Sequence, residues 1–155
     1  MDFELTEPKT DEEWETYWRL RYERLRKDHG LPPGSEREEQ LEEGSTHLVA
    51  KVDGRVVGAA AYVVGMDRDP ATGARTLFVR FRQMGIDPEF EGRGLGSSIT
   101  RHVEEAARSM GASEVRGNVR KENVDWFARL GWIVVGPGET LFGEIESVAM
   151  VSRLT

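Results

Sequence analysis

The sequence predicts one α/β domain over residues 1–155, built on a mixed, mostly antiparallel central sheet of six to seven strands with about four helices. Three β-type runs follow one another between residues 47 and 86 with short turns between them, which is typical of an antiparallel meander. Residues 96–110 then show helical periodicity between two strand-like segments, which indicates a parallel crossover. A chain of 155 residues is long enough to bury one core.

The first third of the chain predicts a short edge strand followed by two helices. Residues 2–6 alternate weakly, and Thr10 or Asp11 is placed to cap a helix that ends near Gly30. The acidic residues 35–43 predict a second helix whose charges we interpret as a solvated face. The expected apolar stripe of the first helix is Trp14, Trp18, Tyr22 and Leu25, with Tyr17 adjacent to it.

The meander that follows consists of strands at residues 47–52, 55–66 and 75–86. Asp53-Gly54 predicts a tight hairpin turn, and residues 67–74 predict a looser one. The helix at 96–110 ends at Gly111, and a strand at 113–119, a short helix at 122–130 and strands at 132–135 and 147–154 complete the fold. The stripe expected to be buried on the helix at 96–110 is Leu95, Ile99, Val103, Ala106 and Met110.

Composition excludes several functional classes. The formal net charge of −7 argues against a nucleic-acid-binding surface. The chain has no cysteine, which excludes disulfides, thiolate nucleophiles and cysteine-ligated metals, and its three histidines show no metal spacing. The acidic start does not resemble a signal peptide, and the longest apolar stretch is too short to cross a membrane. We therefore expect a cytoplasmic protein without a metal.

The most informative segment is the glycine-rich stretch between the third strand of the meander and the helix at 96–110. Gly92, Gly94 and Gly96 leave the backbone bare where that helix begins. Unpaired N–H groups and the positive end of the helix meet at this point, so the segment predicts an anion site suited to a pyrophosphate.

Three nucleotide-binding patterns can be compared with this segment. A P-loop requires a lysine after its last glycine, and none follows Gly96. A Rossmann site requires Gly-x-Gly-x-x-Gly, whereas this chain has Gly92-x-Gly94-x-Gly96 behind antiparallel strands, although Glu114 lies where a ribose-binding acid would be. The third pattern is a coenzyme A site.

Residues 84–96, Met-Gly-Ile-Asp-Pro-Glu-Phe-Glu-Gly-Arg-Gly-Leu-Gly, resemble the acetyl-CoA motif of the GNAT acetyltransferase superfamily, and the predicted order of elements resembles the GNAT fold over nearly the whole chain. The resemblance implies acetyl-CoA as cosubstrate, a backbone N–H of Ile86 for the thioester carbonyl, and an amine acceptor on a small molecule, an amino acid or a protein. It also allows a homodimer. The cofactor-binding residues that it implies are Met84, Gly85, Ile86, Gly92, Arg93, Gly94, Leu95, Gly96, Ser97, Asn123 and Phe127.

Several of these roles have structural alternatives. Arg93 can contact a phosphate or face solvent, Asn123 can contact the cofactor or cap the last helix, and Phe127 can pack beside the coenzyme arm or in the core. The chain also departs from the family motif at its first position, where Glu91 replaces the usual Arg or Gln. A carboxylate beside a pyrophosphate is unfavourable unless it points away.

The catalytic acid and base stay unassigned at this point. Phe127 occupies the position where the family often has a proton-donating tyrosine, and this phenylalanine is usual in one branch of the family. Water can protonate the thiolate instead, another side chain can act, or the domain can bind acyl-CoA without turnover as a regulatory module. A third hypothesis is an acyltransferase that transfers a longer acyl chain than acetyl. The candidates for proton transfer are Tyr22, Tyr62, His47 and Ser98. The candidates for contact with the acceptor are Arg21, Tyr22, Glu38 and Glu39.

Overall fold

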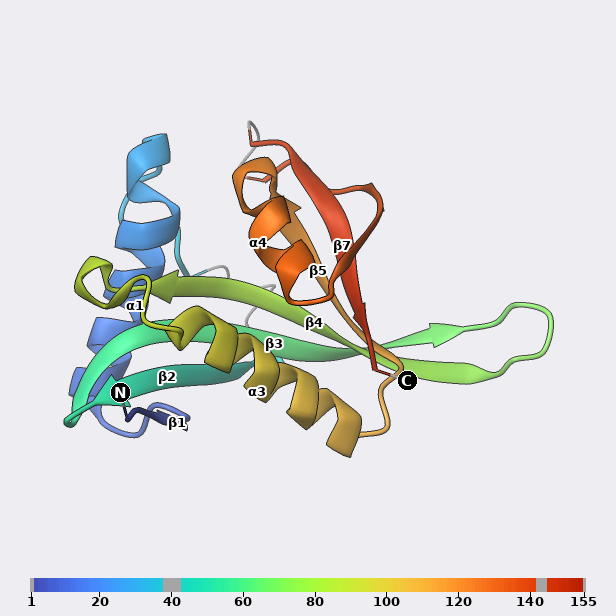
Figure 1. Cartoon of the computed structure of the whole chain (residues 1–155), viewed down its shortest axis with the longest axis horizontal. Coiled ribbons are helices and arrows are strands. Elements are labelled where there is room, and N and C mark those ends of the chain that lie inside the picture. Colours follow the sequence, from blue (N-terminus) through green and yellow to red (C-terminus); the bar gives the residue numbers. More distant parts are fainter. Residues whose placement is uncertain (1, 38–42, 142–144, 155) are drawn as a thin grey trace. The chain divides into compact units, whose positions relative to one another are not determined.

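A computed structural model describes residues 2–37, 43–141 and 145–154 (Figure 1). The expected helix at 35–43 falls largely outside these residues, as do Glu38 and Glu39. The described helices and strands follow the predicted order. They are β1 (Glu4–Thr6), α1 (Asp11–Leu25), β2 (Thr46–Val52), β3 (Arg55–Arg68), β4 (Arg75–Ile86), α3 (Leu95–Ser109), β5 (Glu114–Arg120), α4 (Val124–Arg129), β6 (Ile133–Pro137) and β7 (Ser147–Arg153).

The strands form a seven-stranded sheet in the order β1-β2-β3-β4-β5-β7-β6. Four neighbouring pairs are antiparallel, namely β1 with β2, β2 with β3, β5 with β7 and β6 with β7. The strands β4 and β5 are parallel, with register from Phe78↔Glu114 to Arg80↔Arg116. Helix α3 makes the crossover between the two parallel strands. The predicted mixed, mostly antiparallel sheet is therefore confirmed.

The chain divides into two compact units. The first comprises Met1–Val63 and Gln83–Thr100, and the second comprises Val64–Arg82 and Arg101–Thr155. β3, β4 and α3 each run from one unit into the other.

In the first unit, α1 buries a different face from the predicted one. Thr10 caps the helix by accepting a hydrogen bond from the Glu13 N–H at 3.1 Å, as expected. Tyr17, Leu20 and Arg21 are the buried residues, and Tyr17 and Leu20 join Val49, Val56 and Ala59 in one apolar cluster. Trp14 and Trp18 only flank this cluster. The stripe prediction was wrong because it placed the large indoles rather than Tyr17 at the centre of the buried face.

In the second unit, β5 alternates regularly between its two faces. Val115, Gly117 and Val119 are buried, and Glu114, Arg116 and Asn118 are half-buried on the opposite face. Along α3, burial follows Leu95, Ile99, Val103 and Ala107 rather than Ala106, and Met110 is 38% exposed just beyond the helix end at Ser109.

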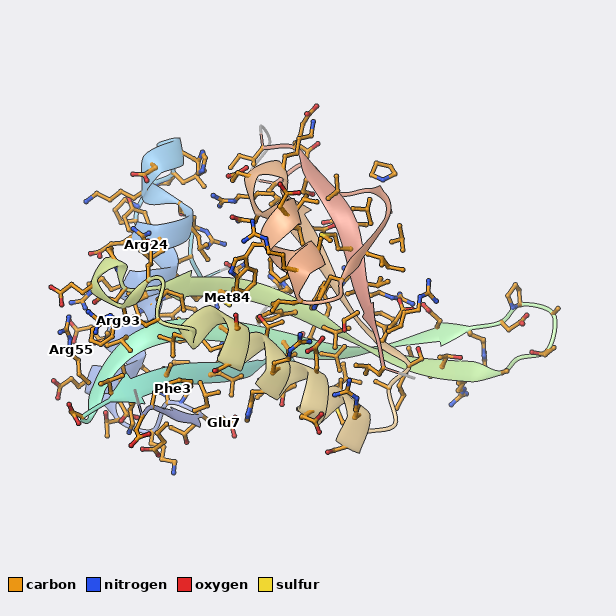
Figure 2. The ribbon with its side chains drawn as sticks, in the orientation of Figure 1. Phe3, Glu7, Arg24, Arg55, Met84 and Arg93 are labelled. Atoms are coloured by element: carbon orange, nitrogen blue, oxygen red, sulfur yellow. The ribbon has the colours of Figure 1, made fainter. Side chains whose placement is uncertain are left out.

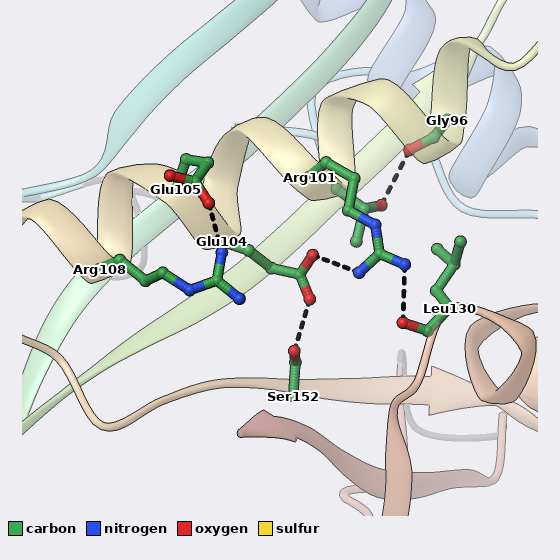
Figure 3. Close-up of polar contacts among 8 residues, drawn as sticks. Gly96, Arg101, Glu104, Glu105, Arg108, Leu130 and Ser152 are labelled. Atoms are coloured by element: carbon green, nitrogen blue, oxygen red, sulfur yellow. Dashed lines mark hydrogen bonds and ion pairs between the residues drawn. The ribbon is translucent and has the colours of Figure 1, made fainter. Parts of the chain in front are cut away.

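A buried carboxylate links α3 to its neighbours within the second unit (Figure 3). Glu104 is 1% exposed, accepts a hydrogen bond from the Ser152 hydroxyl on β7, and pairs with Arg101 at 2.7 Å. Arg101 also donates to the Leu130 carbonyl, just past α4, at 2.9 Å. One charged network therefore holds α3, β7 and the end of α4 together.

Candidate functional site

The turn that carries the chain from β4 to the glycine loop is fixed by backbone and side-chain hydrogen bonds. The Asp87 N–H donates to the Val57 carbonyl on β3 at 2.9 Å, and the Asp87 carboxylate accepts from the Glu89 N–H at 3.0 Å. This aspartate caps a short 3-10 turn at Pro88–Phe90. The start of the glycine loop is thus tied to the sheet.

The glycine loop has the backbone geometry of an anion cradle. Gly92 and Gly94 have φ of 75° and 82°, a region that L-residues rarely adopt, and a Cβ added at either would meet no atom within 4 Å. Helix α3 begins at Leu95, and its first described bond runs from the Ser98 N–H to the Gly94 carbonyl at 3.1 Å. The N–H groups of residues 95–97 have no acceptor within the helix and lie at its positive end.

Arginines offset the acidic residues that precede this cradle, and Figure 2 labels two of these arginines, Arg24 and Arg55. Arg24 of α1 pairs with Glu91 at 2.5 Å, and Arg55 pairs with Asp87 at 3.1 Å and with Glu89 at 3.5 Å. Glu91, the departure from the family motif, is therefore charge-compensated.

Arg93 lies within the glycine loop and stands apart from these pairs. Its guanidinium carbon lies 5.2 Å from the centre of the Phe90 ring, and in the described part of the chain no carboxylate lies within ion-pair distance. Among the described residues, Arg93 is thus a loop cation without a carboxylate to compensate its charge.

The end of β4 that was expected to line the coenzyme arm lies in the same unit as this loop. A Cβ on Gly85 would be 3.2 Å from the Arg24 Cβ and 3.3 Å from the Leu20 carbonyl oxygen, so α1 packs directly on the Gly85 backbone. Just before it, Gln83 has a φ of 61° and its side-chain oxygen accepts a hydrogen bond from buried Arg26 at 2.8 Å. The sequence signalled neither contact.

Asn123 and Phe127 belong to the other unit, so their approach to the cofactor stays a prediction. Asn123 is exposed and occupies the N-cap position of α4, but its side chain makes no capping hydrogen bond. Phe127 packs against Trp126 and Trp132, with ring centres 4.8 Å and 5.0 Å away. Packing against the two indoles therefore accounts in part for a phenylalanine at position 127. Capping by the side chain does not account for the asparagine at position 123.

Two of the candidates for proton transfer, Tyr22 and His47, lie within hydrogen-bond distance of other residues. The Tyr22 hydroxyl donates to the Leu31 carbonyl at 3.0 Å, and Tyr62 is 8% exposed in β3. His47 Nδ1 lies 2.7 Å from the hydroxyl of Tyr17, which also accepts from Arg21 Nη1 at 3.2 Å. Tyr17 lies beside the predicted stripe of the helix, but its position in the sequence gave no sign of this network.

Comparison with known families agrees with the geometry. The family model described as Acetyltransferase (GNAT) family matches residues 7–132. The chain therefore belongs to the GNAT acetyltransferases. Membership in this family makes the chain an acetyl-CoA-dependent N-acetyltransferase, with the acceptor unspecified.

Solved structures share the fold over almost their full length. An aminoglycoside 6'-N-acetyltransferase complexed with coenzyme A is 10% identical with a TM-score of 0.75, covering 100% of this chain and 98% of its own. The ribosomal-protein-S18-alanine N-acetyltransferase from Escherichia coli is 13% identical with a TM-score of 0.71, covering 99% and 95%. FeeM, an N-acyl amino acid synthase from uncultured soil microbes, is 10% identical with a TM-score of 0.76, covering 99% and 91%. Because the sequence identities are this low, the comparison with these structures shows that the fold is shared and nothing more.

Residues 2–37, 43–141 and 145–154 hold no group of three or more His, Cys, Asp or Glu side chains arranged for a metal. In the same residues, no helix combines the length and apolar character needed to cross a membrane.

Proposed function

We propose that this chain holds acetyl-CoA along Met84–Ile86 and over Gly92–Ser97, and passes the acetyl group directly to an amine of a small molecule, an amino acid or a protein. The observation that carries the proposal is the cradle itself. Two glycines in the left-handed region precede the open start of α3, and Arg93 stands beside them with no carboxylate of the described residues in ion-pair distance.

The residues of the cradle suit a pyrophosphate. The N–H groups of residues 95–97 supply donors, Ser97 adds a hydroxyl, and Arg93 supplies a cation that no described carboxylate neutralises. Arg24 holds the Glu91 carboxylate at 2.5 Å and so lowers its repulsion of the phosphates. Side chains at Gly92 and Gly94 would fill the space where the phosphates approach the backbone.

The rest of the site has to orient the thioester and manage one proton. Bound acetyl-CoA supplies the activated acetyl group. The N–H of Ile86 would polarise the thioester carbonyl, and Asn123 and Phe127 would lie along the coenzyme arm. Because Phe127 has no exchangeable proton, we assign protonation of the departing thiolate to water, which suits a good leaving group.

Binding and turnover together test this function. Acetyl-CoA binding is measured by calorimetry, and thiol release is followed with a thiol-reactive dye over a panel of amines. The chain contains no cysteine, so any thiol signal comes from the coenzyme. Tight binding with thiol release for at least one amine is expected. Tight binding without release from any amine would favour the regulatory module, and preference for long-chain acyl-CoAs would favour the longer acyl group.

A further inference from the structure

A pocket of about 510 Å³ in the second unit lies over β5, β6 and β7, outside the cofactor residues. Its floor is the half-buried face of β5 with its antiparallel partners on β7, where Glu114 faces Arg153 and Asn118 faces Ala149. Val135, which is 51% exposed, forms part of its apolar wall. The volume lies in the range of small-molecule sites.

Strand register brings two cations side by side in this pocket. In the parallel pairing of β4 with β5, Arg80 is the direct partner of Arg116, and both line the pocket. Like charges directly opposite each other on one face of a sheet destabilise it. Such a pair therefore calls for compensation by anions.

Arg116 has that compensation within the protein. Its Nε donates to Glu114 at 2.7 Å, and its terminal nitrogens donate to Asp67. The Arg116 guanidinium holds the pKa of the Asp67 carboxyl below its ordinary value, mainly through the hydrogen bond. Glu114 is shared further, since Arg153 lies 3.9 Å from it.

Arg80 lacks an ion pair of this kind among the described residues, although its charge also helps to lower the pKa of the Asp67 carboxyl. In the described ranges no carboxylate lies within ion-pair distance of its guanidinium, whose central carbon is 5.7 Å from the centre of the Phe78 ring. Arg80 as a residue is half-buried. Asn118 adds a neutral donor to the same pocket, because its Oδ1 accepts from the Glu139 N–H at 3.4 Å and its Nδ2 keeps two hydrogens to donate.

We propose that this pocket binds a small carboxylate-bearing molecule, with its carboxylate on Arg80 and Asn118 and its apolar part against Val135. A guanidinium matches a carboxylate with two parallel hydrogen bonds, and an anion there relieves the repulsion between Arg80 and Arg116. This assignment goes beyond the proposed function, since it does not depend on acetyl transfer.

The test is a titration of the full-length, isotope-labelled protein, without acetyl-CoA, followed by two-dimensional NMR. The probes are L-phenylalanine, L-methionine and L-glutamate, their carboxamides, and inorganic phosphate. At least one carboxylate is expected to shift the signals of Arg80, Asn118 and Val135, and its carboxamide is expected to bind at least about tenfold more weakly. Equal binding of acid and amide, shifts for phosphate alone, or no shift at these residues would overturn the proposal.

Variants locate the contact. Arg80→Gln is expected to lower the affinity for the carboxylate ligand at least about tenfold. Arg80→Lys is expected to have an affinity between those of Arg80→Gln and the parent, because lysine keeps the charge but cannot form two parallel hydrogen bonds. Arg68→Gln removes a charge from an exposed position in the same unit and serves as the control with unchanged binding. The melting temperature of ligand-free Arg80→Gln is expected to equal or exceed that of the parent, since a repulsive neighbour of Arg116 is gone. Unchanged binding in Arg80→Gln would contradict the assignment.

Turnover measurements on the same acids then identify the role of the ligand. An acid that binds and is acetylated is the acceptor, and one that binds without being acetylated is an effector. Either result agrees with the proposed pocket, whereas the absence of acetyl transfer to every amine of the wider panel would count against the transferase alone.

Discussion

Arg24 on α1 pairs with Glu91 at the start of the glycine loop, at 2.5 Å. The family motif usually has Arg or Gln where this chain has Glu91, so the partner helix supplies the positive charge from another part of the sequence. Both side chains are accessible, at 32% and 53%, which means that the pair adds little to folding stability. We expect the pair to affect the affinity for acetyl-CoA instead.

The first prediction follows from this pair. Arg24→Ala leaves the Glu91 charge uncompensated near the pyrophosphate, so acetyl-CoA is expected to bind about three- to tenfold more weakly while the melting temperature changes little. Glu91→Gln is expected to bind at least as tightly as the parent, and the double variant is expected to regain most of the loss. Calorimetry over this double-mutant cycle measures the coupling. Additive losses would show that Arg24 acts independently of Glu91.

A second prediction concerns the left-handed glycines. Gly92→Ala places a Cβ in the cradle and strains a φ of 75°, so acetyl-CoA affinity is expected to fall at least about tenfold. Gly73→Ala is the matched control, because Gly73 has a φ of 73° in the β3–β4 turn and open space around it. Both changes are expected to cost about 1–2 kcal/mol of unfolding free energy. Only Gly92→Ala is expected to affect binding, and equal affinities in the two variants would remove the cradle from the site.

A third prediction compares two ion pairs on α3 (Figure 3). Arg101→Ala removes the cation from the buried Glu104 carboxylate and the donor from the Leu130 carbonyl, and is expected to cost about 1–3 kcal/mol. Arg108→Ala breaks an exposed pair with Glu105 and is expected to cost less than about 0.5 kcal/mol. Urea unfolding measures both values. Similar losses would mean that the burial of Glu104 is not what makes its partner important.

The sequence predicted the order of strands and helices and the glycine loop because both depend on local signals. Gly92 and Gly94 are turn glycines that precede a helical repeat, and such a signal is readable within a few residues. The compensation of Glu91 by Arg24 joins residues far apart in the chain and depends on tertiary packing, so no local pattern indicated it.

The buried face of α1 shows the same limit. Trp14, Trp18, Tyr22 and Leu25 fall at helical spacing, yet Tyr17, Leu20 and Arg21 are the buried residues. A helix rich in aromatic residues has more than one plausible apolar stripe. Its orientation is decided by its neighbours, among them the backbone of Gly85 and the Ala60 carbonyl that accepts from the Tyr17 hydroxyl at 3.2 Å.

The close approach of α1 to β4 gives a fourth prediction. Gly85→Ala places a Cβ 3.3 Å from the Leu20 carbonyl oxygen, which is backbone and yields little, so a loss of about 1–3 kcal/mol in unfolding free energy is expected. Gly136→Ala is the control in another strand, because a Cβ there meets nothing within 4 Å. Its loss is expected to stay within about 0.5 kcal/mol. If both substitutions were equally well tolerated, the packing of α1 on Gly85 would be looser than described.

A fifth prediction concerns the acid dependence of stability. Glu13 accepts hydrogen bonds from the Lys9 N–H at 2.8 Å and from Lys51 Nζ at 2.9 Å. The Lys9 bond, followed by the Lys51 bond, lowers the pKa of Glu13 from its ordinary value of 4.5. Because the folded pKa is the lower one, this contribution to stability is fully present above 4.5 and is lost as pH falls through the folded pKa.

Glu13→Gln is therefore expected to be less stable than the parent at neutral pH and to approach it at acidic pH. Melting temperatures of both proteins measured over a series of decreasing pH values give the difference directly. Glu12→Gln, at an exposed position in the same helix turn, is the control and is expected to show a smaller pH-dependent difference. A gap between Glu13→Gln and the parent that stayed constant through the acid range would show that the Glu13 carboxylate does not stabilise the fold through these bonds.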